Sequence, residues 1–126
     1  MGVVAGGEEA VSGSGAAGIT ELEQQNKLLA AGEEITSENI EVYPVQIASN
    51  VIPHVDVFLE NGYTKEEMKL AKEPQKILND RSFAITATAV RIPTAGGHSE
   101  SVNVQFESEF KLKDVRALLI QAPGVT

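Results

Sequence analysis

Two segments with β-strand patterns, Phe83–Ile92 and Val102–Phe110, constrain the fold of this chain more than any other feature. In the second segment Val102, Val104 and two phenylalanines alternate with polar residues. Such alternation predicts one buried face and one wet face, which is typical of an antiparallel or mixed sheet. The loop Pro93–Gly97 separates the two segments. We therefore expect a mixed sheet with helices packed on one face.

Helical patterns precede these strands. A helix is expected over Ala16–Ala31, closed by Gly32 just beyond its end. A second helix begins at a capping box that opens with Thr64. Pro74 lies inside this second helix, where it removes a backbone donor, so we expect a kink or break near Lys72–Glu73.

Three more segments complete the expected order. Ile40–Ile47 predicts a strand, whereas Asn50–Asn61 is compatible with a strand, a loop or a helical turn. A last helix carries Val115–Ala122 and ends at Pro123-Gly124. The order β-α-β-(β)-α-β-β-α predicts the α+β class, with a mixed, largely antiparallel sheet and helices on one face. The length suits one domain, residues 1–126.

Composition excludes several classes of function. The net charge of −8 argues against a nucleic-acid partner, which normally requires clustered Lys and Arg. No stretch approaches the roughly 18 apolar residues of a membrane-spanning helix, so we expect no membrane partner. The chain has no cysteine, which excludes disulfides, thiolate zinc sites and thiol catalysis by its own residues. With two histidines, His54 and His98, we expect no metal site.

Arg91 and His98 flank the loop between the two strand patterns and are the first candidates for a functional site. Arg91 falls in register with the apolar residues of its strand, so its side chain shares their face. An arginine can bind a carboxylate through a bidentate fork, and a histidine can shuttle protons. The alternative is that Arg91 ends a strand in solvent and His98 decorates a hairpin.

Other candidates have weaker patterns. Glu73 and Lys76 are spaced i, i+3 on the second helix, as in an ordinary surface ion pair. The run Ser12-Gly13-Ser14-Gly15 either offers backbone amides to an anion or is simply the entry to a helix. We interpret His54, between Pro53 and an apolar run, as a structural histidine.

Seven segments resemble, in order along the chain, one enzyme family. They are Ala10–Gly15 (AVSGSG), Ile47–Phe58 (IASNVIPHVDVF), Gly62–Lys69 (GYTKEEMK), Lys76–Leu78 (KIL), Thr86–Pro93 (TATAVRIP), Gly97–Val104 (GHSESVNV) and Ala122–Val125 (APGV). From about Val3 to Val125 the chain resembles the catalytic and dimerisation domain of aspartate-semialdehyde dehydrogenases. The resemblance implies the fold of the C-terminal domain that these enzymes share with glyceraldehyde-3-phosphate dehydrogenases.

The resemblance also implies a function and roles for residues. The family uses NADP to convert aspartyl phosphate to aspartate semialdehyde in amino-acid biosynthesis, so we expect a cytoplasmic protein. His98 would be the general acid/base. Arg91 and Glu73 would hold the carboxylate and amino groups of the substrate, Lys76 would contact its phosphate, and Glu9 occupies the family's glutamine position. The residues expected near the nicotinamide end of the cofactor are Ser12, Gly13, Ser14 and Gly15.

The chain also departs from the family's pattern. The catalytic cysteine is absent, and we expect no cofactor-binding Rossmann domain and no cofactor bound by this chain alone. Glu8 and Glu9 replace a tyrosine and a glutamine, and Ser49 replaces a phenylalanine. We infer a truncated, engineered domain that is inactive alone, and we interpret these three residues as solubilising changes.

Three functions remain open from the sequence. The first is an enzyme-derived fragment with a residual substrate pocket and no turnover. The second is an engineered non-enzymatic scaffold, or an oligomerisation or binding module, on the same fold. The third is a subunit that completes its site with another chain carrying the cysteine. In each case we expect Arg91 and His98 to converge near the ends of adjacent strands, with Glu73 and Lys76 not far away, and a possible homo-oligomer through the sheet face.

Overall fold

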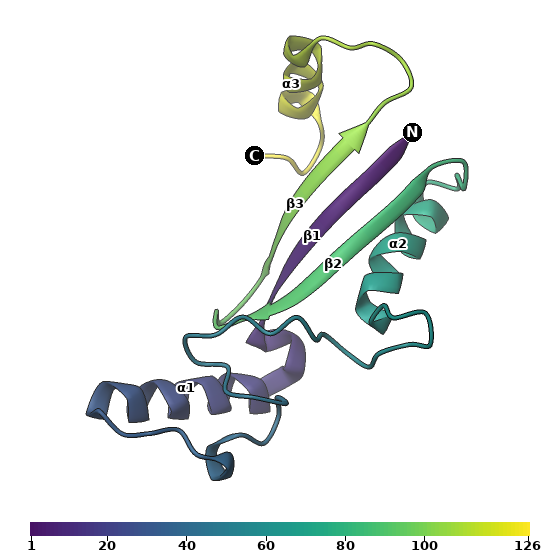
Figure 1. Cartoon of the computed structure of the whole chain (residues 1–126). Coiled ribbons are helices and arrows are strands. Elements are labelled where there is room, and N and C mark those ends of the chain that lie inside the picture. Colours follow the sequence, from purple (N-terminus) through teal and green to yellow (C-terminus); the bar gives the residue numbers. More distant parts are fainter.

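A three-stranded mixed sheet forms the centre of the protein, as a computed structural model of all 126 residues shows (Figure 1). The strands are β1 (Gly2–Ala10), β2 (Ala84–Ile92) and β3 (His98–Gln105), in the order β2-β1-β3. The central β1 pairs with β2 in parallel and with β3 in antiparallel orientation. The predicted α+β class with a mixed sheet is confirmed.

The protein has three α-helices: α1 (Gly15–Ala31), α2 (Lys65–Ile77) and α3 (Leu112–Gln121). Short 3-10 helices, η1 (Val11–Ser14) and η2 (Ser37–Asn39), flank α1. Helix α2 runs along one side of the sheet and packs against β2, whereas α1 lies beyond the end of β1 and α3 lies beyond β3 (Figure 1). The predicted end of α1 is confirmed, because Gly32 adopts the left-handed conformation with φ of 74°.

Helix α2 begins at the predicted capping box. The Thr64 hydroxyl accepts a hydrogen bond from the Glu67 amide at 3.2 Å, and the Glu67 carboxylate accepts one from the Thr64 amide at 2.8 Å. Of the kink or break predicted near Lys72–Glu73, the break is wrong, because α2 continues through Pro74 to Ile77. Proline removes one donor of the helix, and its own carbonyl still accepts from the Leu78 amide at 2.9 Å.

The segment 40–47 forms no strand, and the prediction of one is wrong. Its backbone amides bond to side chains of α1 instead of a neighbouring strand. Glu21 accepts from the amides of Glu41 and Val42, and Gln25 accepts from the amides of Ile47 and Ala48. The largest buried apolar cluster forms at this junction, from Val11, Leu22, Tyr43, Ile47, Ala48 and Ile52.

Strand β3 is shorter than predicted and ends at Gln105 rather than Phe110. The expectation of one buried face is also wrong for this strand, because all its residues are exposed. Val102 retains 53% of its surface, and Phe110 beyond the strand retains 56%. The reason is that α2 packs over β2 and no helix of this chain covers β3. The apolar residues of the alternating pattern in β3 therefore form an exposed surface, of the kind that a surface outside this chain would bury.

Candidate functional site

The C-terminal end of β1 brings the sequence-predicted candidates into one row across the sheet. Glu9 pairs with Arg91 on β2 and with His98 on β3. Directly paired residues of neighbouring strands point to the same face, so all three side chains lie on the side that α2 covers. Arg91 and His98 therefore share a face, as expected, but their strands are not adjacent, because β1 lies between them. That part of the prediction is wrong.

Glu9 and Arg91 form a buried ion pair within this row. Arg91 Nη1 lies 3.3 Å from Glu9 Oε2, and the two side chains are 8% and 9% exposed. The same Nη1 donates a hydrogen bond of 2.7 Å to the carbonyl of Ala10. A guanidinium that is removed from water needs polar partners, and Nη1 of Arg91 has two of them, the Glu9 carboxylate and the Ala10 carbonyl. The interpretation of Glu9 as a surface solubilising residue is wrong, because its side chain is buried.

The charges around Glu9 act on it in opposite directions. Its pKa is raised above the ordinary value, chiefly because burial penalises the carboxylate and secondly because the Glu66 carboxylate is nearby. The charges of Arg91, His98 and Lys69 lower the pKa but do not compensate. Glu9 thus holds a proton more strongly than a free glutamate does, although its carboxylate faces an arginine.

Backbone contacts hold Arg91 in place from two sides. Its amide and carbonyl exchange hydrogen bonds of 2.8 and 2.9 Å with Ile52, a member of the buried apolar cluster. On the other side, Gly13 of η1 packs directly against the guanidinium. A Cβ atom on Gly13 would lie 2.6 Å from Arg91 Nη1, closer than real Cβ contacts come. Gly13 is therefore needed for close approach to Arg91.

The glycines at the start of α1 have the spacing G-x-G-x-x-G, from Gly13 through Gly15 to Gly18, which the sequence argument overlooked. In dinucleotide-binding folds this spacing lets the backbone approach a pyrophosphate. Here two of the glycines approach protein atoms. A Cβ on Gly18 would lie 2.5 Å from the Tyr43 hydroxyl and 2.7 Å from the carbonyl oxygen of Val11. The close packing around Gly13 and Gly18 accounts for glycine at both positions, so a bound dinucleotide is not needed to explain them.

Helix α2 contributes a second ion pair near the row, which the sequence argument also missed. Lys69 Nζ donates to Glu66 Oε2 at 2.7 Å, and the pKa of Lys69 is raised mainly by this hydrogen bond. Both charges act on Glu9. The predicted pair Glu73 and Lys76 has the same spacing but lies about 10 and 15 Å farther along the helix than Glu66, at 1.5 Å per residue. The structure does not bring that pair to the row, and spacing alone could not tell the two pairs apart.

The Ser12–Gly15 segment forms η1 and the entry to α1, at the edge of this site. Ser12, Gly13 and Gly15 are exposed. No side chain caps the N-terminus of α1, and no acidic residue lies in its first turn. The free amides and positive end of a helix suit a polar or anionic group. His54 packs against Phe58, with ring centroids 4.6 Å apart and ring planes tilted by 33°.

Comparison with known proteins identifies the family. The family described as semialdehyde dehydrogenase, dimerisation domain, matches residues 4–126. The chain belongs to this family. Its predicted resemblance to aspartate-semialdehyde dehydrogenases is confirmed by relatives of that name: the protein of Aquifex aeolicus is 45% identical over 98% of this chain, and that of Legionella pneumophila is 47% identical over 94%.

Solved structures agree with this assignment. Aspartate semialdehyde dehydrogenase II of Vibrio cholerae, solved as a complex with ASA, superposes with a TM-score of 0.91 at 40% identity over 98% of this chain. This semialdehyde dehydrogenase domain covers 36% of the V. cholerae chain, 36% of the A. aeolicus protein and 33% of the L. pneumophila protein. It therefore spans about a third of the length of the relatives that it matches.

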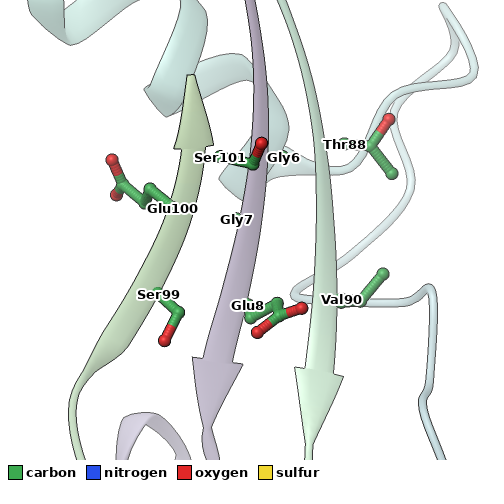
Figure 2. A pocket seen from close by; sticks show the side chains of 8 residues that line it. All are labelled: Gly6, Gly7, Glu8, Thr88, Val90, Ser99, Glu100 and Ser101. Carbon is green, nitrogen blue, oxygen red and sulfur yellow. The ribbon is translucent and has the colours of Figure 1, made fainter. Parts of the chain in front are cut away.

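The other face of the domain's sheet is open, because Glu8, Thr88 and Ser101 on it are exposed. Figure 2 shows the side chains on this face. A shallow hollow of about 340 Å³ lies there, over the middle of the three strands. Its lining includes Gly6 and Glu8 of β1, Thr88 and Val90 of β2, and Ser101 of β3. The small side chains that line the hollow leave this part of the surface recessed, and Glu8 adds an exposed carboxylate. The recessed face has the shape to receive a surface from outside the chain.

No helix of the domain is long and apolar enough to cross a membrane. No group of three or more His, Cys, Asp or Glu side chains is placed to hold a metal ion.

Proposed function

We propose that this domain provides the substrate-binding and dimerisation part of an NADP-dependent aspartate-semialdehyde dehydrogenase of the cytoplasm, and that it has no activity alone. The observation that carries the proposal is the buried Arg91, aligned with His98 in one row in a domain of this family. A buried guanidinium at a strand end suits the recognition of a substrate carboxylate.

The residues of the row suit distinct tasks. Arg91 would bind the carboxylate of the substrate, and His98, exposed at the start of β3, would give or take a proton at the reacting carbonyl oxygen. For the phosphate, the geometry favours Lys69, which acts on Glu9, over the predicted Lys76. Likewise Glu66 is better placed than Glu73 to contact the amino group.

The nucleophile and the cofactor have to come from outside these residues. Acyl transfer from a phosphate requires an accessible thiolate or an equivalent nucleophile, and the chain has no cysteine. NADP, when bound, would exchange the hydride. The segment Ser12, Gly13, Ser14 and Gly15, exposed except for the half-buried Ser14, fits the border of its nicotinamide end, because the helix entry carries neither a side-chain cap nor an acidic residue.

A chimera tests the proposal. The part of the A. aeolicus relative outside the matched region would be joined to this domain, and phosphate-dependent NADP reduction by aspartate semialdehyde would be measured. Both Glu9 and Glu9→Gln versions are needed, since a carboxylate adjoins Arg91. We expect turnover, at least with Gln, and a loss of kcat/KM of about 100-fold in Arg91→Ala, as for a broken charged contact of about 3 kcal/mol. A folded chimera that turns over equally well without Arg91 would refute the assigned role.

We also propose that the open face of the sheet is the homodimer interface. The family description supports homo-oligomerisation, and the shallow hollow of small residues on this face supports the location. Thr88→Arg, in the hollow, should shift sedimentation towards the monomer. Thr20→Arg, on the exposed side of α1, is the matched control and should leave the dimer intact. An unchanged dimer with Thr88→Arg would place the interface elsewhere.

A further inference from the structure

The geometry points to Glu9 as an internal counter-ion of Arg91, which prevents this site from taking an external carboxylate until Glu9 is neutral. Glu9 would thereby determine which ligands the site accepts. The inference rests on the proposed role of Arg91 as the anion-binding residue, and it adds that in this chain the role is blocked by a neighbour on the adjacent strand.

The contact has the form of an occupied anion site. Glu9 Oε2 lies 3.3 Å from Arg91 Nη1, where a ligand carboxylate would otherwise bind. Strand register fixes the two side chains side by side, and both are more than nine-tenths buried. No buried side-chain nitrogen lacks a hydrogen-bond partner, and Nε and Nη2 of Arg91 form no hydrogen bond. Those two nitrogens therefore have donors left for a ligand.

The charges at this site cancel only when Glu9 itself is ionised. Arg91 of β2 and Lys69 of α2 are positive, whereas Glu66 of α2 is negative, like Glu9 itself. His98 of β3 is the remaining titratable neighbour. With Glu9 ionised the two positive and two negative groups sum to zero, so an incoming carboxylate gains no net attraction. With Glu9 neutral the site has one positive charge in excess, in surroundings of low dielectric where it acts strongly.

The inference predicts how the affinity for a simple carboxylate depends on Glu9. Succinate would be titrated into the 126-residue chain and its Glu9→Gln variant, by calorimetry and by amide chemical shifts of Gly13, at fixed ionic strength. We expect Glu9→Gln to bind at least about tenfold more tightly, which corresponds to about 1.4 kcal/mol. Glu23→Gln, which removes an exposed charge from α1, is the matched control and should bind as the parent does.

A pH series provides a second test. Because Glu9 becomes neutral as the pH falls, acidification should raise the affinity of the parent chain for succinate relative to that of Glu9→Gln, measured at the same pH so that protonation of the ligand is matched. In Glu9→Gln this contribution should be absent, since no ionisable group remains at position 9.

The outcomes separate this inference from the proposed function. Equal affinity of the parent and Glu9→Gln, with binding abolished by Arg91→Gln, would overturn the counter-ion role and leave the role of Arg91 standing. Absence of succinate binding in every variant at every pH would overturn both. Tighter binding by Glu9→Gln that persists when Arg91 is also changed would overturn the pairing of these two residues.

Discussion

Gln25 connects α1 to the segment that follows it, and its loss should destabilise the domain more than any surface change. The side chain is fully buried and makes four hydrogen bonds. Its Nε2 donates to Glu21 Oε1 at 3.1 Å and to the Asn39 carbonyl at 2.8 Å. Its Oε1 accepts from the amides of Ile47 and Ala48, both at 3.0 Å.

The cost of Gln25→Ala follows from what it leaves unpaired. Two amides in fully buried residues, Ile47 and Ala48, lose their only acceptor, and each unpaired buried group costs about 1–3 kcal/mol. Partial entry of water and the higher helix propensity of alanine offset part of this. We expect a loss of about 3–4 kcal/mol, a large fraction of the roughly 5–15 kcal/mol that stabilises a domain.

Urea unfolding followed by circular dichroism would measure this loss as a fall in the transition midpoint at unchanged slope. Gln24→Ala is the matched control, because it makes the same substitution one position earlier on the exposed side of α1. Its effect should lie within about 0.5 kcal/mol of zero. If the two variants unfold at the same urea concentration, or Gln25→Ala loses less than about 1 kcal/mol, the network does not hold the segment.

Three further predictions follow from the site and its surroundings. Gly18→Ala should lower the free energy of unfolding by about 1–2 kcal/mol despite the helix preference for alanine, because the added methyl group would clash with the Tyr43 hydroxyl and the Val11 carbonyl. Calorimetry would measure this loss, and a higher melting temperature would contradict it. The raised pKa of Glu9 means that its stability contribution is fully present below its ordinary pKa and is lost as pH rises through the folded-state value. The stability of Glu9→Gln relative to the parent, from urea unfolding at pH 4 and pH 7, should therefore increase with pH, and a fall would refute the direction of the shift. Glu8→Gln should tighten the homodimer about tenfold by removing one carboxylate per protomer from the proposed interface, and sedimentation equilibrium showing no change would argue against that interface.

Local signals predicted the elements that depend on local interactions. The end of α1 at Gly32 and the capping box at Thr64 were found because each satisfies backbone groups within a few residues. The segment 40–47 has strand-like composition, yet its donors bond to Glu21 and Gln25, some twenty residues earlier. Composition does not show where a donor finds its acceptor when that acceptor is a distant side chain.

The site was predicted in part for a similar reason. Motif resemblance singled out Arg91, His98 and Glu9, and the structure places them in one row. The ion pair between Glu9 and Arg91 depends on register, since a slip of one residue would turn Glu9 to the open face beside the hollow. Sequence spacing does not distinguish Lys69 from Lys76, because each lies three residues after a glutamate of α2, and only the direction of the helix shows which end of α2 lies near the row.

One set of contacts joins the stability of the domain to its proposed chemistry. Gln25 accepts hydrogen bonds from the amides of Ile47 and Ala48. Ile52, four residues after Ala48, exchanges two backbone hydrogen bonds with Arg91. On the opposite side, Gly13 of η1 leaves room for the guanidinium, and η1 packs against α1, which carries Gln25. Arg91 is thus held between two segments that α1 organises. Loosening α1 should therefore weaken anion recognition even where no residue of the row is changed.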